Sequence, residues 1–399
     1  MTYLSATLSS WRLGLWIQGF KMKKISALSL LTAMAVGVPA AQAGDLNING
    51  FLSVGASMLD KNDAEIAGAD NQGGFKQDTI LGLQVSKQVN DSTSLTGQLV
   101  SRGSDNYSTE AAWAFVTYSA NDELDLRMGR LRIPAFYYSD FLEVGYTYNS
   151  IRPAEEVYRI PFSSIDGVDL AQRFSSGDID GTVQVYYGRY QGDFESNGTV
   201  YEADFRNVTG ISVSANMGNF GSRLSYNQGE LNLGSPAPTG TGLAVAQGSA
   251  NGLAFLYGDS SAAEDFNISG QTSSFIEAAL TYDDGTYSVL AEWTAFDHET
   301  SVLLDDQAWM VSAAMRMGEF TPHVRYSTQK DEFDSGVEGD IQKQFGLEAD
   351  ESSITLGLRY DYDSSTALKF EVQNHDEKTI GGADGDSVTL YSAAVDLVF

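Results

Sequence analysis

The chain has 399 residues, no cysteine and a formal net charge of −29. This charge excludes nucleic acid as a partner, because binding to phosphates needs a basic face, and it suits a surface that meets cations. Without cysteine the protein uses neither disulfides nor thiolate metal sites. Only one apolar run approaches the roughly 20 residues of a membrane-spanning helix, which excludes a helical protein with several spans.

That run, residues 25–41, has the surroundings of a secretory signal peptide. Three lysines (Lys21, Lys23 and Lys24) precede it, and Ala41-Gln42-Ala43 supplies a small-residue cleavage site. A membrane anchor would need a longer apolar span. We therefore predict a signal peptide over residues 22–43.

Residues 1–21 are interpreted as an upstream extension, so that 1–43 are removed and the exported domain covers 44–399. The removed part carries four basic residues and no acidic ones, and the net charge of the exported chain is therefore −33.

From residue 45 onward, short segments alternate apolar and polar side chains. In the first segment, Leu46, Ile48 and Leu52 fall on one parity and Asn47 and Asn49 on the other, which predicts a β-strand with one apolar face. Strands are predicted near 45–58, 78–88, 93–102, 110–120, 123–132, 166–174, 180–189, 206–216, 220–228, 272–282, 286–296, 306–316, 320–328, 351–361, 366–373 and 387–399.

The connections between these strands alternate in length. Seven short turns, near 90–91, 121–122, 175–177, 217–219, 283–285, 317–319 and 363–365, separate eight long loops, near 59–77, 103–109, 133–164, 190–205, 229–271, 297–305, 329–350 and 374–386. Fifteen connections give sixteen strands, and the segregation of loop lengths is typical of a transmembrane β-barrel with short periplasmic turns and long external loops. A soluble sandwich has no reason to segregate them.

The two parities differ as expected for a wall between lipid and water. Leu81, Leu83 and Val85 are on the face predicted to meet lipid, and Gln84 and Ser86 are on the opposite face. Charge on a lipid face costs about 2–4 kcal/mol at the midplane, so the polar parity is expected to face an aqueous lumen. Aromatic residues beside the short turns predict a periplasmic girdle: Tyr118, Phe220, Tyr282, Phe320, Tyr360 and Tyr362.

The stretch 133–164 interrupts the alternation. It is long, aromatic and rich in charges of both signs, which favours an ordered functional loop over disorder. We interpret it as a loop folded into the barrel, where it narrows the bore. Facing charges would create a transverse field at this constriction, for which the candidates are Arg127, Arg130, Arg132, Asp140, Glu143, Arg152, Glu155, Glu156 and Arg325.

Two other roles remain open for the arginines. Each could simply pair with a neighbouring wall carboxylate such as Asp125 or Asp169. Those next to short turns are expected to ring the periplasmic mouth instead: Arg173, Arg316 and Arg359.

Two motifs carry a resemblance to a known family. The last segment alternates from Tyr391 to a terminal Phe399, and Met128-Gly129-Arg130-Leu131-Arg132-Ile133-Pro134 enters the anomalous loop. The ending resembles the C-terminal strand of bacterial outer-membrane proteins, and the loop entry resembles that of Gram-negative porins. The whole exported chain, 44–399, is similar to the general bacterial porins. The resemblance implies a trimer, a third external loop folded inward, and a terminal aromatic read by the barrel assembly machinery. The acidic loop tip of enterobacterial porins is absent, and Pro153-Ala154-Glu155-Glu156 is a loose echo of it.

The function favoured by these observations is passive diffusion of small hydrophilic solutes and ions across the outer membrane. One alternative is a selective channel whose tyrosines (Tyr137, Tyr138, Tyr146 and Tyr148) or loop arginines hold an anion or a sugar. Another is an adhesin or receptor barrel that uses the 229–271 loop, whose Gly, Ala and Ser content favours a flexible cover.

An enzyme is disfavoured, because the three histidines (His298, His323 and His375) belong to no catalytic or metal-binding motif. No cofactor or metal site is expected. The acidic loop tips, such as 331–334, are interpreted as solvated, with cations that bridge lipopolysaccharide phosphates as the alternative.

Overall fold

The computed structural model describes residues 46–62, 66–196, 199–232, 242–259, 261–262, 264–267, 269–345, 349–379 and 383–399. The predicted signal peptide and upstream extension, residues 1–43, lie outside these ranges.

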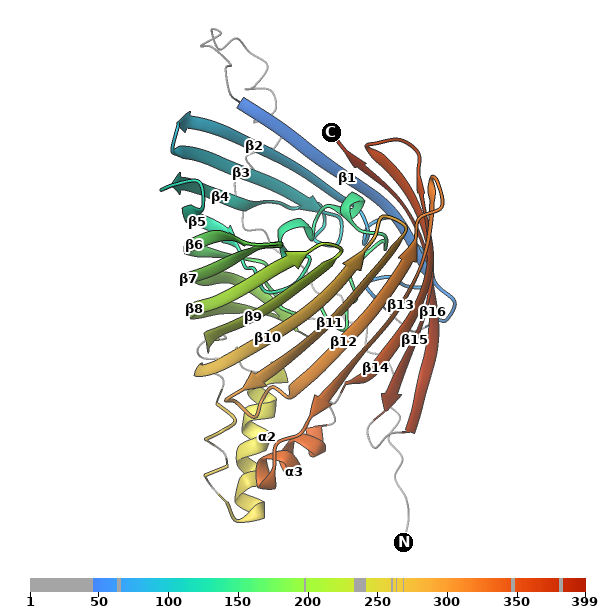
Figure 1. The fold of residues 1–399 in the computed structure, drawn as a ribbon. Helices are drawn as coiled ribbons and strands as arrows, with labels where there is room; N and C mark the ends of the chain where they lie inside the picture. Colours follow the sequence, from blue (N-terminus) through green and yellow to red (C-terminus); the bar gives the residue numbers. More distant parts are fainter. Residues whose placement is uncertain are drawn as a thin grey trace, which may run out of the picture. The chain divides into compact units, whose positions relative to one another are not determined.

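Sixteen antiparallel strands form one closed ring in which each strand pairs with its neighbours in the sequence and β1 pairs with β16 (Figure 1). The strands are β1 (Leu46–Leu59), β2 (Ile80–Asn90), β3 (Thr93–Arg102), β4 (Thr109–Ser119), β5 (Leu124–Arg132), β6 (Ser164–Ser176), β7 (Ile179–Ser196), β8 (Thr199–Met217), β9 (Phe220–Asn232), β10 (Ser269–Asp283), β11 (Tyr287–His298), β12 (Asp305–Met315), β13 (Phe320–Glu332), β14 (Asp350–Asp361), β15 (Thr366–Thr379) and β16 (Ala383–Val398). The predicted sixteen-stranded antiparallel barrel is confirmed.

The ring is closed by the last strand. The register of β1 with β16 runs from the pair Phe51–Val398 to the pair Leu59–Leu390. One residue further, the backbone N–H of Phe399 donates to the Gly50 carbonyl at 3.0 Å, and the Gly50 N–H donates to the Phe399 carbonyl at 2.8 Å. β1 therefore pairs with the last residues of the chain from Gly50 to Leu59 and with β2 from Leu46 to Ser53, which closes the barrel.

The short turns lie where the sequence predicts them, but two of the predicted long loops are wrong. The 190–205 loop is a hairpin, because β7 continues to Ser196 and β8 begins at Thr199. The predicted 374–386 loop is also too long, because β15 continues to Thr379 and β16 begins at Ala383. In both places backbone pairing continues the strands beyond the segments predicted from alternation.

Two other external connections contain helices. Helix α2 (Gly242–Tyr257) lies within the 229–271 loop, and α3 (Gly336–Phe345) lies within the 329–350 loop. Ala250 and Ala254 of α2 pack in one apolar cluster with Ile341 of α3. The 229–271 loop is therefore not merely a flexible cover. No helix among the described residues is long and apolar enough to cross a membrane.

The two faces of the wall differ as predicted. The exposed parity carries large apolar side chains, among them Leu81, Leu224, Leu280 and Leu356. Beside the short turns, Phe220 packs on Tyr282 with ring centroids 5.1 Å apart, and Phe320 packs on Tyr360 at 4.9 Å. The opposite parity, here called the inner face, is mostly polar, as in Thr321, His323, Arg325 and Ser327 of β13.

Candidate functional site

The stretch between β5 and β6, residues 133–163, makes the contacts that define the candidate site. We call it the β5–β6 segment; it contains two short 3₁₀ turns, η1 (Ser139–Phe141) and η2 (Gly145–Thr147). In Figure 1 it is the green irregular segment that follows β5. Its hydrogen bonds reach the inner faces of β1, β9, β11, β12, β13, β14, β15 and β16.

Basic side chains of the inner face donate to carbonyl oxygens of this segment. Arg325 donates to the Arg152 carbonyl at 2.8 Å, and Arg359 donates to the Tyr146 carbonyl at 2.7 Å. Lys369 Nζ donates to the carbonyls of Gly145 at 2.6 Å and Ser150 at 2.8 Å, and Arg223 donates to that of Pro134. An irregular buried backbone has no ladder of its own, so side chains must supply its partners.

Acidic side chains of the inner face complete the arrangement. Glu292 accepts from the Tyr137 N–H at 3.0 Å and from the Tyr158 hydroxyl at 2.6 Å. Glu371 accepts from the Ile151 N–H at 2.9 Å. The charged side chains of the inner face therefore bind the segment through its backbone and its tyrosine hydroxyl.

The segment also approaches the closing strands at one glycine. A Cβ built on Gly145 would lie 2.6 Å from Asp396 Oδ1 of β16 and 2.8 Å from Ser53 Oγ of β1. A larger residue at this position would push the segment away from the wall. The two carbonyl bonds made by Lys369 depend on this close approach.

The three arginines predicted to ring the periplasmic mouth all have partners. Arg359 donates to Asp361 and to the carbonyls of Tyr146 and Tyr148 in the segment. Arg173 pairs with Asp125 at 2.7 Å, and Arg316 pairs with Asp283 at 2.7 Å.

Among the predicted constriction residues, Arg132 and Glu143 are brought together. Glu143 accepts from Arg102 at 2.6 Å and from Arg132 at 3.4 Å, and the Arg132 guanidinium lies over the Trp113 ring. Burial alone would raise the pKa of Glu143. The hydrogen bonds and charge of Arg102, with the charge of Arg132, outweigh burial and hold the pKa of Glu143 below its ordinary value.

This depressed pKa gives a pH-dependent contribution to stability. The contribution of Glu143 is present above the ordinary pKa of a glutamate and is lost as the pH falls through that value and below it. We expect Glu143→Gln to lower the thermal unfolding midpoint at pH 7, and the difference from wild type to shrink below about pH 4.5. Circular dichroism melts between pH 7 and pH 3 measure this difference. Asp140→Asn is the control, and a difference that stays constant with pH would contradict the assignment.

The other candidates fall into two groups. Four have partners. Arg127 pairs with Asp169 at 2.6 Å, and Arg152 pairs with Asp78 at 2.7 Å. The Glu156 carboxylate lies 3.8 Å from His375 Nδ1, and Arg325 donates to the Arg152 carbonyl. Asp140 and Glu155 have exposed side chains, and Arg130 is half-buried. No hydrogen bond or ion pair joins Asp140 or Glu155 to another described residue.

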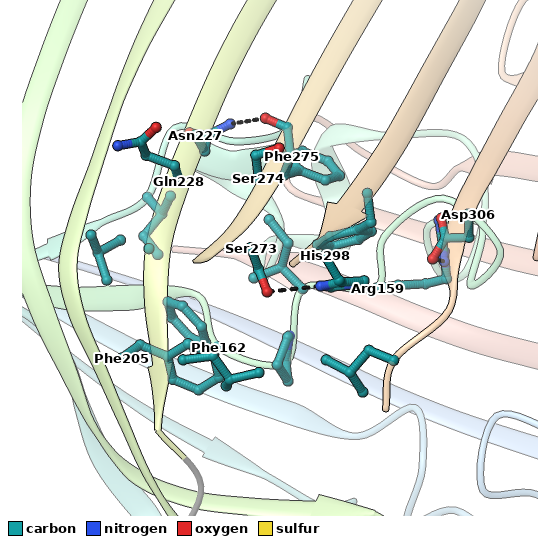
Figure 2. A pocket seen from close by; sticks show the side chains of 18 of the residues that line it. Arg159, Phe162, Phe205, Asn227, Gln228, Ser273, Ser274, Phe275, His298 and Asp306 are labelled. Atoms are coloured by element: carbon teal, nitrogen blue, oxygen red, sulfur yellow. Dashed lines mark hydrogen bonds and ion pairs between the residues drawn. The ribbon is translucent and has the colours of Figure 1, made fainter. Parts of the chain in front are cut away.

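The sequence analysis missed an aromatic patch on the inner face. Tyr186 of β7, Phe205 of β8, Phe275 of β10 and Phe296 of β11 point inward, where polar side chains were expected. They line a cavity of about 250 Å³ together with residues 159–162 of the segment (Figure 2). For Tyr186, Phe275 and Phe296 the signal was available, because each occupies the parity opposite the lipid-facing residues of its strand. Phe205 shares the parity of the exposed Ile211 and Val213, and the register of β8 with β9 shifts between Arg206 and Thr209.

A closed ring with an apolar exposed face, an aromatic girdle and a polar inner face is a transmembrane β-barrel channel. The model of the Gram-negative porin family matches residues 27–396, and the chain belongs to that family. The protein is therefore an outer-membrane channel for passive diffusion of small hydrophilic solutes and ions.

Solved porin structures share the fold. OmpT of Vibrio cholerae in its trimer form is 12% identical, with a TM-score of 0.54, 90% of this chain and 100% of that chain covered. OmpF of Salmonella typhi in complex with daunomycin is 14% identical, with a TM-score of 0.57, 89% and 98% covered. The anion-selective porin from Comamonas acidovorans is 13% identical, with a TM-score of 0.54, 89% and 99% covered. No curated protein sequence matches the chain.

Proposed function

We propose that the β5–β6 segment crosses the space enclosed by the strands and forms the constriction of this diffusion channel. The observation that supports it is the set of hydrogen bonds from one segment to inner-face residues of strands all around the ring, from Arg223 of β9 to Ser57 of β1. Because the segment is bonded to the inner side of so many strands, solutes would pass only through the space between the segment and the rest of the wall.

Asp140, Glu155 and Arg130 are the candidates expected to interact most strongly with a passing ion. Their side chains are exposed or half-buried, and no ion pair joins them to another described residue. Arg127, Arg132, Glu143, Arg152, Glu156 and Arg325 would contribute charge from within the wall and the segment. The channel is proposed to act without catalysis and without a cofactor or metal.

We extend the proposal to export and assembly. Residues 22–43 would be the signal peptide, Tyr391 and Phe399 would belong to the signal read by the barrel assembly machinery, and the barrel would contact outer-membrane lipid and lipopolysaccharide. A homotrimer is proposed because a structural neighbour, OmpT of Vibrio cholerae, is described in a trimer form.

Single-channel recording tests the constriction. A chain without cysteine allows Glu155→Cys to be labelled at one site with a charged, membrane-impermeant thiol reagent. Labelling is expected to lower the conductance of large, steady, ohmic current steps. Leu81→Cys on the lipid face is the matched control. Unchanged conductance after complete labelling of Glu155→Cys would overturn the placement of the segment.

The same recordings separate the alternative functions. A selective channel would show small steps that one anion or sugar blocks at low concentration. A barrel acting as an adhesin or receptor would show no steps.

A further inference from the structure

The aromatic cavity on the inner face is unusual for a wall that meets water. Its volume is about 250 Å³, and it is partly open. Its walls come from β7 to β11 and from residues 159–162 of the β5–β6 segment. Five aromatic rings supply much of its apolar lining: Phe162, Tyr186, Phe205, Phe275 and Phe296.

The rings that form the cavity are fixed by contacts with one another. Phe162 stacks on Tyr190 with centroids 4.5 Å apart and lies 4.7 Å from Phe205. Phe275 lies 4.7 Å from Phe296. Water in such a space finds few hydrogen-bonding partners, so an apolar group that displaces it gains affinity. A dry cavity of about 150 Å³ is known to accept benzene, so this cavity has room for a substituted ring.

Most polar groups around the cavity are already satisfied. Arg159 and Asp306 neutralise each other through two hydrogen bonds of 2.5 Å, and Asn227 accepts from the Tyr186 hydroxyl at 2.6 Å. His298 stacks on Phe296, and its Nδ1 is 2.7 Å from Ser273 Oγ (Figure 2). Within the described part of the chain, no partner is found for its Nε2. The cavity therefore offers His298 Nε2 as a hydrogen-bonding atom beside its aromatic rings, and its ion pair carries no net charge.

The cavity lies near the ends of the strands that carry the long connections. Ser273 is close to the start of β10, Leu231 is close to the end of β9, and His298 is the last residue of β11. In the proposed orientation these are the external ends. A solute that enters from outside would meet the cavity on the external side of the segment.

We propose that this cavity binds the aromatic ring of a small neutral solute that carries a single hydrogen-bonding group, as phenol does. The ring fills the space among Phe162, Phe205 and Phe296, and the polar group bonds His298 Nε2. The proposal rests on the channel function, because a solute held here occupies the path of ions.

The test uses the whole protein in a planar bilayer with phenol added to the external side. The open-channel current reports the channel function by itself. Phenol is expected to cause brief partial blocks whose frequency saturates with concentration. Glucose, which has no aromatic ring, is expected to cause none at the same concentrations. A channel that conducts but is not blocked by phenol, or is blocked equally by glucose, would overturn the cavity proposal and leave the channel function intact.

A cavity-filling variant gives the matched comparison. Gly229 lines the cavity, and the nearest atom to a Cβ built there would be Val208 Cγ2 at 3.3 Å, with the Arg206 carbonyl oxygen and Val208 Cα at 3.7 Å. Gly229→Leu is expected to weaken the phenol block by at least about tenfold, because even one methylene is worth that much in an apolar pocket. Gly97→Leu is the control, since a Cβ at Gly97 meets nothing within 4 Å and this residue lies on the parity of the lipid-facing Leu95. Equal block of the two variants would overturn the proposal.

A second variant tests the polar contact. His298→Leu is expected to weaken the phenol block by several-fold while it leaves a block by toluene unchanged. A parallel loss for both probes would show that His298 only shapes the cavity and would overturn the proposed hydrogen bond. Both measurements compare variants whose open-channel currents are recorded first, so a misfolded variant is recognised by the absence of conductance.

Discussion

Lys369→Met is expected to destabilise the barrel by about 3–5 kcal/mol, because it leaves a buried carboxylate without its partner. Lys369 is fully buried, and its Nζ lies 2.7 Å from Asp396 Oδ2. The same Nζ holds the carbonyls of Gly145 and Ser150, so the β5–β6 segment is also expected to detach from β15. Chemical unfolding measures the first effect, and current noise in single channels measures the second.

A double variant separates the two effects. Lys369→Met with Asp396→Leu removes both charges, so most of the lost stability should return, since a buried ion pair can be replaced by apolar residues. The current should stay noisy, because the Gly145 and Ser150 carbonyls still lack the Lys369 ammonium that joins them to β15. Lys330→Met on the exposed parity of β13 is the control for the substitution itself. A steady current in Lys369→Met would contradict the role of this lysine in holding the segment.

Asp140→Asn combined with Glu155→Gln is expected to shift the ion preference of the channel toward anions. Both side chains are exposed on the proposed constriction segment. One unit charge about 4 Å from an ion in water is worth about 1 kcal/mol, or roughly fivefold in relative permeability. Reversal potentials in a KCl gradient measure the shift. Asp178→Asn, which removes a charge in the β6–β7 turn, is the control.

Removing an arginine of the proposed constriction tests the ion preference in the opposite direction. Arg130→Ala is expected to shift the preference toward cations, because this side chain is half-buried and has no ion-pair partner among the described residues. Arg132→Ala is expected to change selectivity much less, since Arg132 is buried against Glu143 and Trp113. Equal shifts in the two variants would place both guanidinium groups in the ion path.

The sequence predicts the ring of strands well because its signals are local. Alternation of period two predicts which side chains of a strand face lipid and which face water. The length of each connection predicts whether it lies at the periplasmic or the external end of the barrel. The alternation is weak at the far ends of β7 and β8. Residues 190–196 alternate poorly, and they form a strand through their backbone pairing with 199–205. Helices α2 and α3 were missed because both lie in loops rich in small or charged residues.

The site was predictable only in part, because its contacts join residues that are far apart in sequence. The aromatic and charged composition of 133–164 marked the segment, and Glu143 and Arg132 were both named as candidates for the constriction. Nothing local indicates that Lys369 donates to Gly145 or that Arg325 donates to the carbonyl of Arg152. Such pairs follow from ring closure, which places distant strands opposite one another.

The pairing of Phe399 with Gly50 also has a consequence for biogenesis. Until β16 has paired with β1, the sheet has two edge strands, β1 and β15, whose unpaired backbone groups can pair with a strand of another chain. Contacts across nearly the whole length of a polypeptide form slowly, since the intervening chain must first be organised. The protein is therefore most vulnerable to aggregation before its last strand docks, and shielding of β1 during that interval would protect it more than shielding of any interior strand.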